Sequence, residues 1–260
     1  MRYLGGVLFV IPLSVALFGP WLTQAPPRRA PYSDAGLFGT DGLGRDVLTQ
    51  TLLGGRSMLL LALVSLAAAY AVGILIGSLS AATRFDELLT RPLDIVLAVP
   101  AILLLLLVAS TTARGPATVA AVVAVVNAPA IARVVRALAL QIVKSPAAEA
   151  MRMQGEPWYA IRIGLLSRVA ARPLLADAGS RITSAVYLVG AANFLGVGLA
   201  PTASDWAVAI DRNRPGILVQ PWAVVLPALL VVAFAVGANL LADELTRVRD
   251  RSTEPKATRR

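Results

Sequence analysis

Residues 145–173 read SPAAEAMRMQGEPWYAIRIGLLSRVAARP, and this charged stretch lies between two long uncharged runs of the chain. Ser145 and Pro146 suit the N-cap and the first residue of a helix, since the missing N–H of proline costs nothing there. Gly155 is placed to end that short helix, and Pro157 is placed to open a second one. The stretch therefore predicts two short helices with a bend at a glycine, between segments that cross a membrane.

The composition indicates a membrane protein. The chain has 260 residues, of which 57% are hydrophobic and 15% are charged, a proportion too apolar for a soluble domain. The net charge of +9 is compatible with nucleic-acid binding, but in a membrane protein it more often reflects cytoplasmic loops beside lipid headgroups. We therefore expect no nucleic-acid partner.

Two chemically versatile residue types, cysteine and histidine, do not occur in the sequence. Their absence excludes disulfides, thiol catalysis, imidazole bases and His-ligated metals in this chain. No G-x-x-x-x-G-K-[ST] string occurs either, so any ATP must be hydrolysed by another subunit. We expect no catalytic residue, no metal site and no cofactor in this chain.

Six runs are long and apolar enough to cross about 30 Å of hydrocarbon at 1.5 Å per residue. The first run follows Arg2 and also fits a signal peptide, but its length, Pro12 and Pro20 favour a retained span. An even number of spans places both termini on the same side of the membrane. The predicted spans are residues 4–22, 57–80, 95–113, 115–136, 174–200 and 221–243.

The distribution of basic residues indicates which side is the cytoplasm. With both termini inside, 17 of the 24 Lys and Arg residues lie in inner segments and 7 lie in outer segments. This bias fits the positive-inside rule and predicts cytoplasmic termini in the inner cell membrane. The stretch 145–173 then faces the cytoplasm, where an ATPase could reach it.

A compact motif, FGTDGLGRDV at residues 38–47, lies between the first two predicted spans. It predicts a glycine-rich turn, with Asp41 or Asp46 capping a short surface helix beside Arg45. The two aspartates also fit paired catalytic carboxylates or a cation site. A structural Asp–Arg brace outside the membrane is the favoured interpretation, because such pairs are common. The residues assigned to this motif are Gly39, Thr40, Asp41, Gly44, Arg45 and Asp46.

Residues 39–56 closely resemble the GTD-x-LGRD signature near the start of the C-type permeases of dipeptide, oligopeptide and nickel ABC importers. Glu149-Ala150 followed by Gly155 is similar to the EAA loop of ABC importer permeases. Two departures from that loop are Met151 at the third small position and a proline displaced to Pro173.

Further segments resemble the same family in the same order along the chain. Asn193 and Asn239 belong to these segments and lie in predicted spans, where an amide is costly unless it is paired. Helix packing is therefore favoured for them, and for Gly196, over lining a substrate path. Val189 departs from the acidic residue that many relatives have there. The segments are Arg91-Pro92-Leu93-Asp94, Pro129 with Ala132-Arg133 and Arg136, Asn193-Phe194-Leu195-Gly196, Asp205-Trp206 and Asn239.

The resemblance implies an all-α membrane protein of six transmembrane helices, similar to type I ABC importer permeases. It implies a single permease domain over residues 1–260, with a cytoplasmic coupling helix in residues 145–173 that docks onto the ATPase. The residues assigned to this coupling are Glu149, Ala150, Arg152, Gly155 and Trp158.

The resemblance also implies the partners and the function. The partners are a second homologous permease, two cytoplasmic ATP-binding subunits that hold ATP and Mg, an external substrate-binding protein and membrane lipids. The implied function is ATP-driven import of di- or oligopeptides by alternating access, with nickel complexes or haem-like cargo as alternatives. A passive channel or scaffold is a different class of protein that fits the apolar spans equally well.

Overall fold

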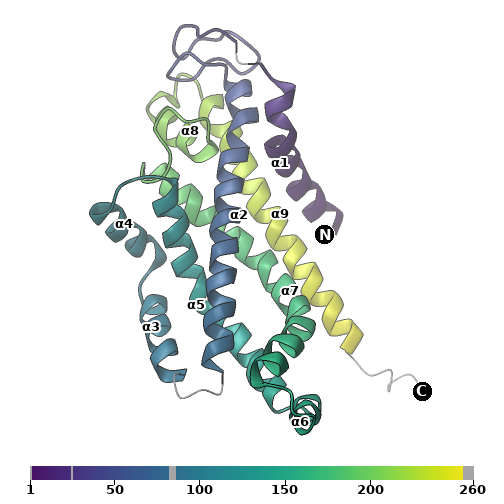
Figure 1. Cartoon of the computed structure of the whole chain (residues 1–260). Coiled ribbons are helices and arrows are strands. Elements are labelled where there is room, and N and C mark those ends of the chain that lie inside the picture. Colours follow the sequence, from purple (N-terminus) through teal and green to yellow (C-terminus); the bar gives the residue numbers. More distant parts are fainter. Residues whose placement is uncertain (1, 25, 82–85, 254–260) are drawn as a thin grey trace, which may run out of the picture. The chain divides into compact units, whose positions relative to one another are not determined.

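A computed structural model describes residues 2–24, 26–81 and 86–253 (Figure 1). Within these residues the regular structure is helical, apart from an isolated antiparallel bridge between Thr40 and Asp46. The all-α class predicted from the sequence is therefore confirmed. The helices are α1 (Arg2–Leu22), α2 (Val47–Ser80), α3 (Asp86–Ala98), α4 (Ala101–Thr111), α5 (Pro116–Val143), α6 (Pro146–Met153), α7 (Trp158–Phe194), α8 (Trp206–Asn213), the 3-10 helix η1 (Arg214–Gly216) and α9 (Trp222–Thr253).

The chain forms two compact units. One unit comprises Met1–Leu61 with Ile182–Arg260, and the other comprises Ala62–Arg181. The division falls within α2 and within α7, so each of these helices contributes residues to both units. That the whole chain acts as a single permease domain stays a prediction.

In the first unit, α1 packs along α9, and α8 also packs against α9 (Figure 1). The ring centroids of Phe9 and Phe234 lie 5.0 Å apart, and the Phe234 side chain is buried. Gly237 lies where the two helices approach closely, because a Cβ atom at this position would be 2.4 Å from the backbone nitrogen of Phe9. A small residue lets the helix backbones meet, as it does between packed membrane helices in general.

In the second unit, α5 supplies much of the buried surface, and both α3 and α4 pack against it. Val119, Val123, Ile131 and Val135 of α5 are fully buried and lie three to four residues apart or at multiples of that spacing. By contrast, α3 contains no buried residue. Its position on α5 therefore depends on polar contacts, which are described below.

Four helices of the described chain are long and apolar enough to cross a membrane, in α1, α2, α5 and α9. A fifth span results if α3 and α4 count together as one broken span. The six spans predicted from the sequence are therefore not all matched by a helix of suitable length and composition.

The predicted third span, residues 95–113, is not one straight helix. The helix α3 ends at Ala98, α4 begins at Ala101, and the two are bent by 96°. Pro100 is the physical reason, because proline disfavours a helical conformation at the residue before it, here Val99. Pro100 itself is extended, with ψ 129°, and is the N-cap of α4.

Of the predicted fifth span, residues 174–200, only residues 174–194 are helical, and they belong to the longer helix α7, which is not among the described helices apolar enough to span. The predicted span contains two charged residues, Asp177 and Arg181, which are paired with each other inside the helix. Arg181 and Asp177 form an i,i+4 ion pair, and the hydroxyl of Tyr70 donates to Asp177 at 2.9 Å.

The helix α2 likewise begins at Val47 rather than at the predicted residue 57. Asp46 is the residue before it, and the backbone N–H of Thr49 donates to Asp46 Oδ2 at 2.8 Å. This is an N-cap contact. The cap, rather than the start of the apolar run, therefore fixes where α2 begins.

Replacing Gly237 with Val should weaken the packing of α1 on α9, because the added Cβ would overlap the backbone of Phe9. We expect a loss of about 1–3 kcal/mol, seen as a lower thermal unfolding temperature of the purified protein in detergent. Gly6→Val is the matched control, since nothing lies within 4 Å of a Cβ built at Gly6. Equal unfolding temperatures for the two variants would contradict this packing.

Candidate functional site

The helix α6, within the stretch 145–173, is capped at its N-terminus as the sequence predicts. Ser145 is the N-cap, its side chain accepts from the backbone N–H of Ala148 at 3.3 Å, and Pro146 is the first helical residue. The hydroxyl of Ser145 also donates to the carbonyl of Ile142 at 2.7 Å. One side chain therefore joins the end of α5 to the start of α6.

Gly155 ends α6 in the left-handed conformation, with φ +79°. Its N–H donates to the carbonyl of Arg152 at 3.0 Å, and the N–H of Glu156 donates to the carbonyl of Met151 at 3.1 Å. This pair of bonds is a Schellman motif, in which glycine avoids the strain that a Cβ atom brings at positive φ. A Cβ at Gly155 would meet nothing within 4 Å, so the requirement for glycine is conformational and not steric.

The residues assigned to coupling lie on or next to this short helix. Ala148 is buried, whereas Glu149, Ala150, Arg152 and Gly155 are exposed. Arg152 is also anchored, because its Nη2 donates to the carbonyl of Val143 at 3.0 Å. Trp158 is the first residue of α7, and its side chain lies outside the described residues.

Met153 adds an apolar contact surface to the same short helix. Its side chain is 80% exposed, although the residue is apolar. The helix thus presents a mixed surface of small, charged and flexible apolar side chains, a combination that suits an adaptable protein contact.

In the loop before α2, the carboxylate of Asp41 is a buried centre of hydrogen bonds. Its Oδ1 accepts from the backbone N–H groups of Leu43 at 2.9 Å and Arg45 at 2.8 Å. Its Oδ2 accepts from Nε of Arg45 at 3.0 Å and Nη2 of Arg212 at 3.1 Å. The carboxylate is saturated with donors, so this structural brace leaves Asp41 no free oxygen for catalysis.

The other assigned residues of this loop, Gly39, Thr40, Gly44 and Asp46, shape the turn around Asp41. Thr40 is buried, and its hydroxyl donates to the carbonyl of Ala30 at 2.7 Å. Gly39 and Gly44 have positive φ, and a Cβ at Gly44 would lie 2.0 Å from the carbonyl oxygen of Arg29. Asp46 caps α2, because its Oδ2 accepts from the backbone N–H of Thr49.

Sequence reasoning missed the partner of this loop, which is the end of α8. Arg212 shares Asp41 with Arg45, and Asn213 accepts from the N–H of Gly42 at 2.9 Å. Burial lowers the pKa of the Arg212 guanidinium, the positive charge of Arg45 lowers it further, and Asp41 opposes both effects. The Asp205-Trp206 pair was the sequence signal available near this region. That pair does not indicate that Arg212 contacts Asp41, 171 residues earlier in the chain.

Asp205, before α8, is a second buried carboxylate in the same unit. Its Oδ1 accepts from the N–H groups of Ala207 at 3.0 Å and Val208 at 3.3 Å, which makes it the N-cap of α8. Ser57 donates to its Oδ2 at 3.0 Å. Burial raises the pKa of Asp205, and these donors only partly offset that effect.

The two asparagines assigned to packing or to the substrate path differ in their surroundings. Asn193 is buried, and its Oδ1 accepts from the N–H of Leu199 at 3.2 Å, just past the end of α7. Gly196, at φ +69°, turns the chain there. Asn239 is exposed on α9. Asn193 and Gly196 thus have structural contacts, and nothing in the described chain assigns Asn239 a role.

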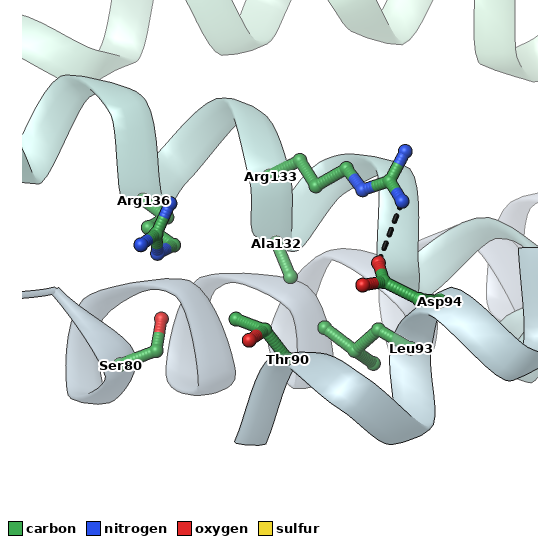
Figure 2. Close-up of a pocket in the computed structure, with 7 residues that line it drawn as sticks. All are labelled: Ser80, Thr90, Leu93, Asp94, Ala132, Arg133 and Arg136. Atoms are coloured by element: carbon green, nitrogen blue, oxygen red, sulfur yellow. Dashed lines mark hydrogen bonds and ion pairs between the residues drawn. The ribbon is translucent and has the colours of Figure 1, made fainter. Parts of the chain in front are cut away.

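A polar pocket of about 310 Å³ lies between α3 and α5 in the second unit (Figure 2). It brings together residues of 91–94 and 129–136, two segments in which the sequence resembles the importer permeases. Arg133 pairs with Asp94 at 2.6 Å, and Arg136 makes a bidentate pair with Asp86. Both Arg133 and Asp94 are more than half exposed, so their pair holds α3 weakly. The lining residues are Ser80, Thr90, Leu93, Asp94, Ala132, Arg133 and Arg136.

Residues 37–251 match the family described as "Binding-protein-dependent transport system inner membrane component". The chain belongs to this family. The predicted resemblance to the permeases of ABC importers is thereby confirmed, and so is the membrane fold class. An inner membrane component of this kind works in a transporter complex with other subunits.

Individual relatives of this inner membrane component cover almost its whole length. It is 31% identical over 263 residues to the "Probable D,D-dipeptide transport system permease protein DdpC" of Escherichia coli (strain K12), covering 96% of this chain and 86% of the relative. It is 29% identical over 263 residues to the "Di/tripeptide transport system permease protein DppC" of Pseudomonas aeruginosa (strain UCBPP-PA14), covering 95% and 87%. A putative peptide transport system permease protein of Brucella suis biovar 1 (strain 1330) is 30% identical over 257 residues, covering 95% and 86%.

The saturated carboxylate of Asp41 predicts a large effect of a neutral replacement in this inner membrane component. Asp41→Asn should destabilise the fold by about 3 kcal/mol, because it leaves two mostly buried guanidinium groups without an anion. Thermal unfolding of the purified protein in detergent measures the loss. Asp34→Asn is the matched control, since Asp34 is an exposed residue of the same loop.

A different result would identify a functional site instead of a brace. If Asp41→Asn unfolded at the wild-type temperature but abolished transport, Asp41 would act on substrate or on a bound cation, and the structural interpretation would be wrong.

Proposed function

We propose that this chain is the permease subunit of an ATP-driven importer that carries di- or oligopeptides across the inner membrane by alternating access. The names of the relatives, which are peptide or dipeptide permeases, support the substrate class. The subunit itself is non-catalytic in this proposal, and ATP with Mg is bound and hydrolysed by partner subunits. Two such subunits sit on the cytoplasmic side, a second homologous permease completes the pathway, and an external binding protein delivers the peptide.

The observation that carries the proposal is the helix α6. It is capped at both ends, exposes Glu149, Ala150 and Met153, and is anchored to the end of α5 through Arg152. Isolated helices of this length are marginal in water, so a conformational role for so short an exposed helix requires such caps and anchors. We infer that α6 is the coupling helix and that the ATPase binds its exposed surface.

For transport, the contact between α6 and the ATPase must shift the equilibrium between two arrangements of the permease pair. A ligand shifts an equilibrium only by its differential affinity for the two states, and a reversal from 1:99 to 99:1 needs about 5.5 kcal/mol. Closure of the ATPases around ATP supplies this energy in the proposal, and α6 transmits it. Both termini then lie in the cytoplasm, on the same side as α6.

Single cysteines can test the orientation cleanly, because the chain contains no native cysteine. Leu37→Cys, at a residue that is 77% exposed, should react with a membrane-impermeant maleimide added outside intact cells. Met153→Cys, at a residue that is 80% exposed, should react only in inside-out vesicles. Labelling of both positions from the outside would refute cytoplasmic placement of α6.

Replacing Gly155 with Val should uncouple ATP hydrolysis from transport. A β-branched residue at φ +79° is strained by about 1–2 kcal/mol, so the turn after α6 would relax and misplace the helix. We expect insertion and binding of the external protein to persist in reconstituted vesicles. Peptide transport should fall, with the ATPase either released or hydrolysing ATP without transport.

Gly155→Asn provides the matched control, because asparagine tolerates the left-handed conformation better than other side chains. It should retain most transport in the same vesicles. Full transport and normal ATPase retention in Gly155→Val, with Glu149→Ala also silent, would remove α6 from the coupling role.

A further inference from the structure

An apolar groove of about 280 Å³ lies in the first unit, between α2, α7, α8 and α9. Tyr187 and Phe194 both line it from α7, seven residues or about 10.5 Å apart along the helix. Gly190 lies between them in the sequence and also lines the groove, where a Cβ would be 2.9 Å from Cε of Met58. The lining residues are Met58, Val186, Tyr187, Gly190, Ala191, Phe194, Ala207, Ile210 and Val231.

The positively charged side chain of Arg214 lies beside this groove. The guanidinium carbon of Arg214 lies 5.9 Å from the ring centroid of Phe194, within the range of a cation–π contact. Arg214 is exposed and forms no ion pair with any residue that the structure describes. Its charge is therefore available to an anion that approaches the Phe194 end of the groove.

The backbone around Arg214 is held in place, which suits a binding residue. The neighbouring Asn213 accepts from the N–H of Gly42 and donates to the carbonyl of Ala209 at 2.8 Å. Gly216 packs on Tyr32 so closely that a Cβ would lie 2.3 Å from that ring. Arg214 thus projects from a segment fixed at both ends, so little backbone ordering is needed when it binds.

We propose that this groove is a subsite for the transported peptide, in which the groove holds an apolar side chain and Arg214 binds the peptide's carboxylate. The inference rests on the proposed function as a peptide permease. Charge complementarity favours this occupant, because a peptide carries a free carboxylate within a few ångströms of its last side chain. A phospholipid acyl chain fits less well, since the distance of about 10.5 Å from Tyr187 to Phe194 along the groove is shorter than the leaflet's hydrocarbon depth of about 15 Å.

The residues of the groove also match an apolar side chain of variable shape. Methionine side chains, such as that of Met58, adapt to different shapes, while Tyr187 and Phe194 offer aromatic surfaces for aliphatic or aromatic side chains. The subsite therefore predicts a preference for peptides with an apolar residue beside a free C-terminus, over peptides with a charged residue there.

Photo-cross-linking in the complete transporter tests this subsite. The probe is a dipeptide of alanine followed by p-benzoyl-phenylalanine with a free carboxylate, delivered by the external binding protein and trapped with vanadate. We expect mass spectrometry to find cross-links in residues 186–194 of α7. Arg214→Gln should lower their yield about tenfold at subsaturating peptide, as loss of one charge-assisted contact does. Arg114→Gln, at another exposed arginine, should leave the yield unchanged.

A variant that fills the groove tests the apolar part of the subsite independently of Arg214. Ala191→Leu should compete with the apolar side chain and lower cross-linking of this probe, while transport of Gly-Gly, which has no side chain to place there, continues. Transport of Gly-Gly that fell as far as that of Leu-Leu would overturn the proposed role of the groove.

Other outcomes distinguish this inference from the proposed function. Peptide transport by the wild type without cross-links in α7, or with cross-links unaffected by Arg214→Gln, overturns the subsite alone. A phospholipid that co-purifies with the wild type and is lost in Arg214→Gln, without peptide cross-links, assigns the groove to lipid. A complex that binds its partners but transports no peptide overturns the proposed function, and the subsite with it.

Discussion

The buried carboxylate of Asp41 is the interaction on which the arrangement of the loop before α2 depends. A carboxylate that is 1% exposed is costly unless donors surround it, and four N–H groups do so here. Three of them belong to the local turn, namely the backbone N–H groups of Leu43 and Arg45 and Nε of Arg45, and the fourth comes from Arg212 at the end of α8. The loop and α8 are thus fixed together by charge.

The second aspartate of the motif, Asp46, has a structural role different from that of Asp41. Asp46 lies past the turn and faces the N-terminus of α2, where its carboxylate satisfies a backbone N–H that has no partner within the helix. The two carboxylates of one short motif therefore have separate structural tasks. These contacts favour the structural interpretation of both carboxylates over a paired catalytic site.

Local signals in the sequence were sufficient wherever one residue determines the backbone. Ser145 and Pro146 predict the start of α6, and Gly155 predicts its end, because a cap and a left-handed glycine act within one turn of a helix. The long apolar runs of α1, α2, α5 and α9 were equally readable, since excluding charge from hydrocarbon is a property of composition.

Features that depend on contacts between distant residues could not be predicted in the same way. A search for uncharged runs registers the apolar residues on both sides of Pro100 but not the 96° bend between them. It also does not register that Asp177 and Arg181, inside the predicted span 174–200, pair with each other within α7. Arg212 carries no local signal, because its role is defined only by a carboxylate 171 positions earlier.

The contacts of α6 with α5 and α7 determine which of these two helices would move if α6 were displaced. Towards α5 they are tight, because Ser145 bonds to Ile142 and Arg152 bonds to Val143, with Ala148 buried beside them. Towards α7 the chain passes through Gly155, around which there is open space. A displacement of α6 would therefore pass mainly into α5.

The helix α5 can carry such a displacement over about 42 Å, since it has 28 residues at 1.5 Å each. Beyond α6, the described residues of α5 form ion pairs with α3 through Arg136 and Arg133. These pairs are partly exposed, so they can break and form again at little cost, whereas the apolar contacts of α5 are buried. The α3–α5 contact is consequently the part of the second unit best suited to change when α6 is moved, and α3, which buries no residue of its own, is the helix most free to follow.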